Sequence, residues 1–88
     1  MKMIFAIVDD TKSEAISQAL LTANFRVTQL ASTGGFLRGG ATTLMAGVED
    51  NKVEQALQVI RDQIPPSSDP EKIRATLYVI NVKSFDRV

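Results

Sequence analysis

Arg26 and Thr28 are the residues of this sequence whose types and spacing best suit ligand chemistry. They lie two positions apart, so in a β-strand both side chains point from the same face. A guanidinium can hold a phosphate through two parallel hydrogen bonds, and a threonine hydroxyl can donate to a base nitrogen or accept from an amine. The alternative is a polar strand face turned toward water, and by spacing alone that is the commoner arrangement.

A glycine-rich segment, Ser32 to Thr43, follows these two residues and holds four of the chain's five glycines. The simpler interpretation is a hairpin loop whose glycines supply positive φ angles. A hairpin needs fewer glycines, however, and Phe36 and Leu37 at its tip would face water unless a ligand or partner covers them. Glycine-rich backbone can also approach an anion closely. The segment matches neither of the common phosphate-binding glycine motifs, since a strand pattern follows it.

The composition excludes several kinds of site. The chain has no cysteine and no histidine, which excludes disulfides, Cys/His zinc sites and Ser-His-Asp triads within it. Asp9 and Asp10 could be imagined as paired catalytic carboxylates, but capping of a helix is the better interpretation. No convincing acid–base pair remains, so we expect a protein that is not an enzyme. Ten basic and ten acidic residues balance, which removes the broad positive surface of a nucleic-acid binder.

The length and hydropathy of the chain predict a single domain, residues 1–88, in the cytoplasm. The opening MKMIFAIV is too short for a signal segment, and no apolar run approaches the ~18 residues of a membrane span. A domain this small buries little core for its surface, and oligomerisation is a common remedy.

Hydrophobic periodicity predicts four strands and two helices. Alternating or dense apolar runs indicate strands at 3–8, 25–32, 42–48 and 73–82, the first of them buried on both faces. A helix is expected after a capping box of Thr11 and Glu14, with an apolar stripe over 15–23 and a stop at Asn24. Acidic residues 49–51 would cap a second helix over 53–60, and a proline-rich loop, 65–70, would end it.

The predicted order β-α-β-β-α-β is that of an α+β, ferredoxin-like fold: a four-stranded antiparallel sheet with both helices on one face. The other face has no cover within the chain, which favours association through it. Asn24 is best interpreted as a helix cap rather than a ligand contact. Tyr78 faces opposite to Leu77 and Val79, and its spacing fits the core and a stacking surface equally well.

The run from Asn24 to Asp50, NFRVTQLASTGGFLRGGATTLMAGVED, resembles the PII-like cyclic-di-AMP receptor family. The tail from Ala75 to Phe85 resembles the last strand and C-terminal segment of the same family. With the opening Met1 to Ile4, the resemblance covers nearly the whole chain outside the proline-rich loop. It implies a PII-like homotrimer that binds a nucleotide in clefts between subunits.

The resemblance also implies roles for particular residues. Arg26 would contact phosphate, while Thr28 and the backbone near Gly47 would recognise adenine. Tyr78 occupies the position of a Phe that stacks on the base. The full set of expected ligand-binding positions is Asn24, Arg26, Thr28, Gly35, Phe36, Leu37, Ala41, Gly47, Tyr78 and Arg87.

Three departures from the family pattern leave two interpretations open. Ala41 stands where the family usually has Asn, Arg87 stands near a usual Gln, and the loop after the second helix is short. The first interpretation is a non-enzymatic sensor of cyclic-di-AMP or another adenine nucleotide, which signals to an unknown downstream protein by loop rearrangement. The second is a trimeric protein-interaction module that has lost or changed its nucleotide.

Overall fold

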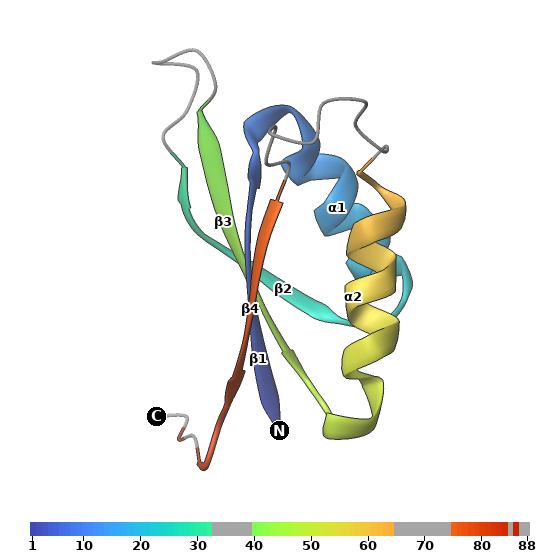
Figure 1. The fold of residues 1–88 in the computed structure, drawn as a ribbon, viewed down its shortest axis with the longest axis vertical. Coiled ribbons are helices and arrows are strands. Elements are labelled where there is room, and N and C mark those ends of the chain that lie inside the picture. Colours follow the sequence, from blue (N-terminus) through green and yellow to red (C-terminus); the bar gives the residue numbers. More distant parts are fainter. Residues whose placement is uncertain (33–39, 65–74, 85, 87–88) are drawn as a thin grey trace.

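The computed structural model describes residues 1–32, 40–64, 75–84 and 86. Its elements follow the order β1 (Lys2–Asp9), α1 (Asp10–Thr22), β2 (Arg26–Ser32), β3 (Ala41–Val48), a 3₁₀ turn (Asp50–Lys52), α2 (Val53–Asp62) and β4 (Ala75–Asn81). The residues described form one four-stranded antiparallel sheet in the order β2-β3-β1-β4, and both helices lie on one of its faces (Figure 1). The predicted α+β fold with βαββαβ order is therefore confirmed.

Helix α1 begins two residues earlier than the predicted capping box, in which Thr11 is the N-cap. Asp9 is the N-cap, and its carboxylate accepts a hydrogen bond from the Thr11 backbone N–H at 3.0 Å. Thr11 therefore lies inside the helix, and Glu14 instead accepts a hydrogen bond from Gln18 at 3.2 Å. The capping-box prediction was wrong because an aspartate placed earlier caps the same free amides. The expectation that the Asp9-Asp10 pair caps this helix is confirmed for Asp9.

The end of α1 was predicted correctly and sets where β2 begins. Asn24 has φ 70°, the left-handed conformation that asparagine tolerates better than most residues. The Asn24 N–H donates to the Leu21 carbonyl at 3.0 Å, and the Phe25 N–H donates to the Leu20 carbonyl at 2.9 Å. These two bonds make a Schellman motif, which is completed by the burial of both Leu20 and Phe25. The chain then turns directly into β2 at Arg26.

Helix α2 does not receive the acidic cap that its sequence suggests. Residues 50–52 form a 3₁₀ turn, and neither Glu49 before that turn nor Lys52 before the helix caps it through a side-chain hydrogen bond. Asp50 makes an ion pair with the Met1 ammonium instead, at 2.8 Å. The helix is held by its apolar stripe, because Ala56, Leu57 and Ile60 are buried.

The core lies between the sheet and the helices. Alternate residues of the strands point into it, and α1 adds Ile16 and Leu20. The buried strand residues are Ile4, Ala6 and Val8 of β1, and Thr42, Leu44, Ala46 and Val48 of β3, with Phe25 just before β2. Among the described residues no helix is long and apolar enough to cross a membrane.

The outer face of the sheet, which the helices leave uncovered, is largely apolar. We use this name for the side that carries Met3, Phe5, Ile7, Met45, Tyr78 and Ile80, as the strand register and the alternation of side chains require. Ile7 is 37% exposed, Tyr78 53% and Ile80 49%. The prediction that the first strand is buried on both faces was wrong for a single copy of the chain, since within the described residues only the helix side is covered.

Candidate nucleotide-binding site

Arg26 and Thr28 lie on the outer face of edge strand β2, both exposed, as their spacing predicted. The register of β2 with β3 places Arg26 opposite Gly47 and Thr28 opposite Met45. Because directly opposite residues share a face, Gly47 and Met45 lie on the outer face as well. A register shift between Gln29 and Ala31 follows, so the simple alternation of β2 holds only for its first half.

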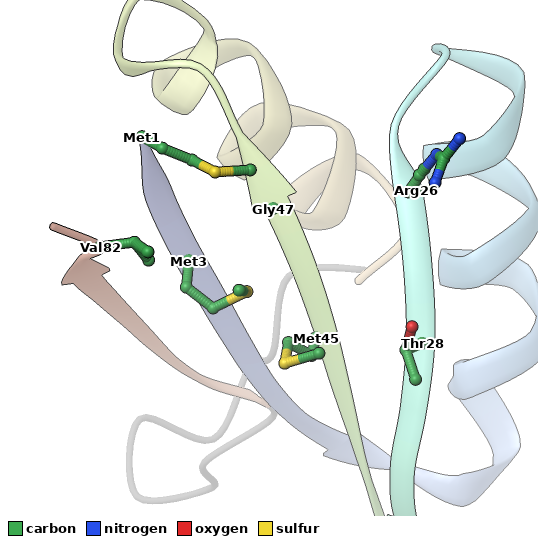
Figure 2. Close-up of a pocket in the computed structure, with 7 residues that line it drawn as sticks. All are labelled: Met1, Met3, Arg26, Thr28, Met45, Gly47 and Val82. Atoms are coloured by element: carbon green, nitrogen blue, oxygen red, sulfur yellow. The ribbon is translucent and has the colours of Figure 1, made fainter. Parts of the chain in front are cut away.

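These residues line a pocket of about 270 Å³ (Figure 2). Its lining residues come from four strands or their ends: Met1, Met3, Arg26, Thr28, Met45, Gly47 and Val82. Three of the residues predicted for the site are therefore brought together, namely Arg26, Thr28 and Gly47. The sequence reasoning missed the apolar side of the pocket, to which all three methionines of the chain contribute.

The pocket has one charged corner and an apolar remainder. Within the described part of the chain, the Arg26 guanidinium takes part in no ion pair and no side-chain hydrogen bond. Figure 2 shows Arg26 and Thr28 on one strand, with the methionine side chains across the neighbouring strands. A free guanidinium suits a phosphate, and polarizable thioethers pack well against aromatic rings. The arrangement therefore fits a ligand with both an anionic group and a planar apolar group.

Gly47 gives the pocket room. It lies in β3 between Met3 of β1 and Arg26 of β2, so its backbone groups are directed toward the neighbouring strands. A Cβ atom at this position would lie 3.0 Å from the Met1 Cε atom. The space above Gly47 is thus shared by Met1 and whatever enters the pocket.

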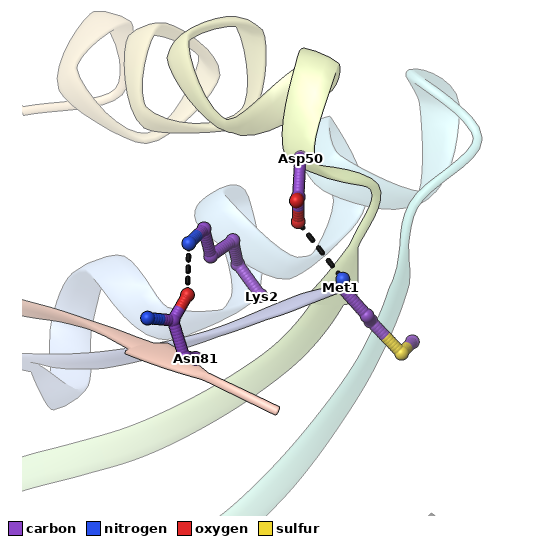
Figure 3. A network of polar contacts seen from close by, with 4 residues as sticks. All are labelled: Met1, Lys2, Asp50 and Asn81. Carbon is purple, nitrogen blue, oxygen red and sulfur yellow. Dashed lines mark hydrogen bonds and ion pairs between the residues drawn. The ribbon is translucent and has the colours of Figure 1, made fainter. Parts of the chain in front are cut away.

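Met1 is anchored at the end of the pocket by its main chain. Its carbonyl accepts a hydrogen bond from the Val82 N–H at 3.0 Å, and its ammonium pairs with the Asp50 carboxylate at 2.8 Å (Figure 3). The hydrogen bond and the positive charge of that ammonium lower the pKa of the Asp50 carboxyl below its ordinary value. Beside it, Lys2 donates a hydrogen bond to the side chain of Asn81.

Tyr78 lies on the outer face but does not line the pocket, and it is distant from Thr28. The row of opposite residues runs Thr28, Met45, Phe5, Tyr78, from one edge of the sheet to the other. Three strand spacings of ~4.8 Å separate its ends by about 14 Å. Tyr78 is 53% exposed, so it is not part of the core of a single copy, and its stacking role stays a prediction.

Ala41 and Asn24 do not line the pocket of one copy. Ala41 opens β3, six residues before Gly47, which at ~3.4 Å per residue is about 20 Å away. Asn24 occupies the turn before β2, where its role as a helix stop is established. Gly35, Phe36, Leu37 and Arg87 lie outside the described residues.

Comparison with known proteins identifies the family. The sequence profile of the cyclic-di-AMP receptor family matches residues 1–73 of this chain. The chain belongs to that family. It is also similar to a protein from Pediococcus pentosaceus ATCC 25745, described as functionally unknown, whose crystal structure superposes with a TM-score of 0.76. The two sequences are 34% identical, and the match covers 99% of this chain and 96% of the other.

Membership in the cyclic-di-AMP receptor family confirms the resemblance seen in the sequence. The family is one of receptors rather than enzymes, in line with the expectation from composition. The matched residues include β1, β2 and β3 and hence Arg26, Thr28 and Gly47, whereas β4 with Tyr78 lies beyond them. Within the residues that the structure describes, no cluster of three or more acidic, His or Cys side chains could hold a metal ion.

Proposed function

We propose that this chain is a non-enzymatic receptor for an adenine nucleotide, with cyclic-di-AMP as the first candidate. The observation that carries the proposal is the pocket, in a member of the cyclic-di-AMP receptor family. Arg26 and Thr28, whose side chains have no partner among the described residues, lie there opposite Gly47 and the side chains of Met1, Met3 and Met45. Arg26 binds phosphate, and Thr28 forms a hydrogen bond with the base. The methionines pack against the ring.

The proposed site is shared between copies of the chain. Ligand pockets usually have volumes of about 300–1,000 Å³. A pocket of about 270 Å³ is small for a whole dinucleotide and suits one base with its phosphate. Tyr78 lies at the opposite edge of the outer face and Ala41 at the far end of β3, so neither reaches Arg26 in the same copy. Residues at separate edges can complete one site only when a neighbouring copy brings them together.

A homotrimer supplies that neighbour in our proposal. The outer face exposes Ile7, Tyr78 and Ile80, and the small helix-side core gives a chain of 88 residues reason to bury them. Three copies pack through this face, and each pocket faces the β4 edge of the next copy. The nucleotide then changes the conformation of loops beside the cleft, and a downstream protein recognises the change.

Calorimetry combined with light scattering tests both halves of the proposal. The parent should bind cyclic-di-AMP, ATP or ADP with measurable heat, and it should scatter as three copies at micromolar concentration. Ile80→Asp places a charge on the outer face and should give a folded monomer that binds no nucleotide tightly. Leu21→Asp, which alters an exposed leucine of α1 on the helix side, is the matched control. A parent that is a stable monomer would contradict the shared site.

A second candidate is a trimeric interaction module without a nucleotide. It is favoured by Ala41, which lacks the side-chain amide expected at that position. This candidate predicts the same light scattering as the first but no heat with any adenine nucleotide.

A further inference from the structure

Met1 lines the pocket with an exposed side chain, while contacts from two other parts of the chain fix its main chain. The carbonyl bond to Val82, just after β4, and the ion pair with Asp50 of the 3₁₀ turn hold its backbone from two different parts of the chain. The side chain is 39% exposed and has three rotatable bonds. Its Cε atom rests over Gly47, where only the lack of a Cβ leaves room for it.

This position brings Met1 to the entrance beside Arg26. Arg26 and Gly47 are directly opposite each other on neighbouring strands, so the methyl group above Gly47 lies next to the strand that carries the guanidinium. A nucleotide that places its phosphate at Arg26 therefore has to share the space above Gly47 with the Met1 methyl group. Met1 must either pack against the ligand or be displaced by it.

We propose that Met1 is a ligand-binding residue: its side chain leaves Gly47 and closes on the purine ring of the bound nucleotide. This inference rests on the proposed function and adds to it a residue that the family pattern does not assign. We call the mobile Met1 side chain the adjustable wall of the pocket. The thioether favours closure because sulfur and methyl groups pack well on aromatic rings. Closure also covers a side chain that is 39% exposed in the free chain.

Met1→Ala tests the inference while it preserves the anchors. A precursor that begins Met-Ala loses its initiator, because the processing enzyme removes methionine before a small residue. Residue 1 then keeps its ammonium for Asp50 and its carbonyl for Val82. We expect cyclic-di-AMP affinity to fall about two- to tenfold by calorimetry. Leu21→Ala removes an equally exposed apolar side chain from α1, outside the pocket, and should leave affinity unchanged.

Methyl NMR gives a readout that a merely structural role would not move. The chain has three methionines, so [methyl-¹³C]methionine labelling gives three signals, and the Met1 signal is the one missing from Met1→Ala. Cyclic-di-AMP should shift the Met1 signal of the parent. If Met1→Ala melts much below the parent, this shift decides the question in place of its affinity.

The outcomes distinguish a failure of this inference from a failure of the proposed receptor function. Binding by the parent, with weaker binding by Met1→Ala and a shifted Met1 signal, supports the adjustable wall. Binding by the parent with unchanged or tighter binding by Met1→Ala, or with an unmoved Met1 signal, overturns the wall and leaves the receptor function intact. A parent that binds no adenine nucleotide overturns the function, and the inference is then wrong with it.

Discussion

Replacing Arg26 by alanine should weaken nucleotide binding while leaving the fold intact. The side chain is exposed on β2, and within the described residues it makes no ion pair or side-chain hydrogen bond that folding would lose. Exposed substitutions of this kind change the free energy of unfolding by about 0.5 kcal/mol or less. In a chain of this size, such a change in the free energy of unfolding shifts the melting temperature by at most about 4 °C.

The loss of affinity follows from the chemistry of the contact. A hydrogen bond to a charged group contributes about 1.5–3 kcal/mol, which corresponds to roughly tenfold to more than a hundredfold in affinity. Arg26 is exposed, so water and salt screen its contact with phosphate, and we expect the lower end, about tenfold. The loss should shrink as salt rises. Arg26→Lys should recover only part of it, because an ammonium lacks the planar fork.

Calorimetry at two salt concentrations, with thermal melts of each variant, measures these effects. Arg61→Ala removes the same charge from the last turn of α2, which does not line the pocket, and serves as the matched control. Thr28→Val keeps the shape and strand propensity of Thr28 and deletes its hydroxyl, so its loss of affinity reports the contact with the base. The reasoning is refuted if Arg26→Ala binds as tightly as the parent. It is also refuted if that variant unfolds.

Three further changes test neighbouring positions. Asn24→Gly should keep the parent melting temperature, since glycine accepts φ 70° as readily as asparagine. A lower affinity of this variant would then report a contact between the Asn24 amide and the ligand. A large drop in its melting temperature would contradict the expectation. Ala41→Asn should tighten cyclic-di-AMP binding by up to about tenfold in calorimetry, and weaker binding would count against a shared site. Asp50→Asn should melt below the parent at neutral pH. Because pairing lowers the Asp50 pKa in the folded chain, that difference should vanish as pH falls well below the ordinary value of 3.8.

The elements of this fold could be predicted because their signals are local. The end of α1 is closed by two local hydrogen bonds: the Asn24 N–H donates three positions back, and the Phe25 N–H donates five positions back. The burial of Ile16 and Leu20 follows helical spacing. Arg26 and Thr28 share a face for an equally local reason, the two-residue period of a strand. Boundaries differ by one or two residues where competing caps lie side by side, as with Asp9 and Thr11 at the start of α1.

The apolar half of the site could not be predicted, since it depends on strand register. Met3 and Met45 share the pocket because β1 pairs with β3 so that Met3 lies opposite Gly47. Nothing in either segment alone specifies that register. Asp50 illustrates the same limit. Its local sequence resembles the Asp9-Asp10 pair, yet a positive group 49 residues away in the chain takes the carboxylate that a local cap would use.

A site shared between copies, as we propose, predicts that ligand binding is coupled to assembly. Arg26 is on one edge strand of the sheet and Tyr78 is on the other. In the proposed site, a nucleotide that contacts both Arg26 and Tyr78 therefore bridges two copies. A ligand that binds only the assembled state stabilises it by RT ln(1 + [L]/Kd), about 2.7 kcal/mol per site at a hundred times Kd. A stabilisation of that size favours the assembled state about a hundredfold for each occupied site. In the proposed trimer, a change in nucleotide concentration would therefore change subunit association even where each copy keeps its fold.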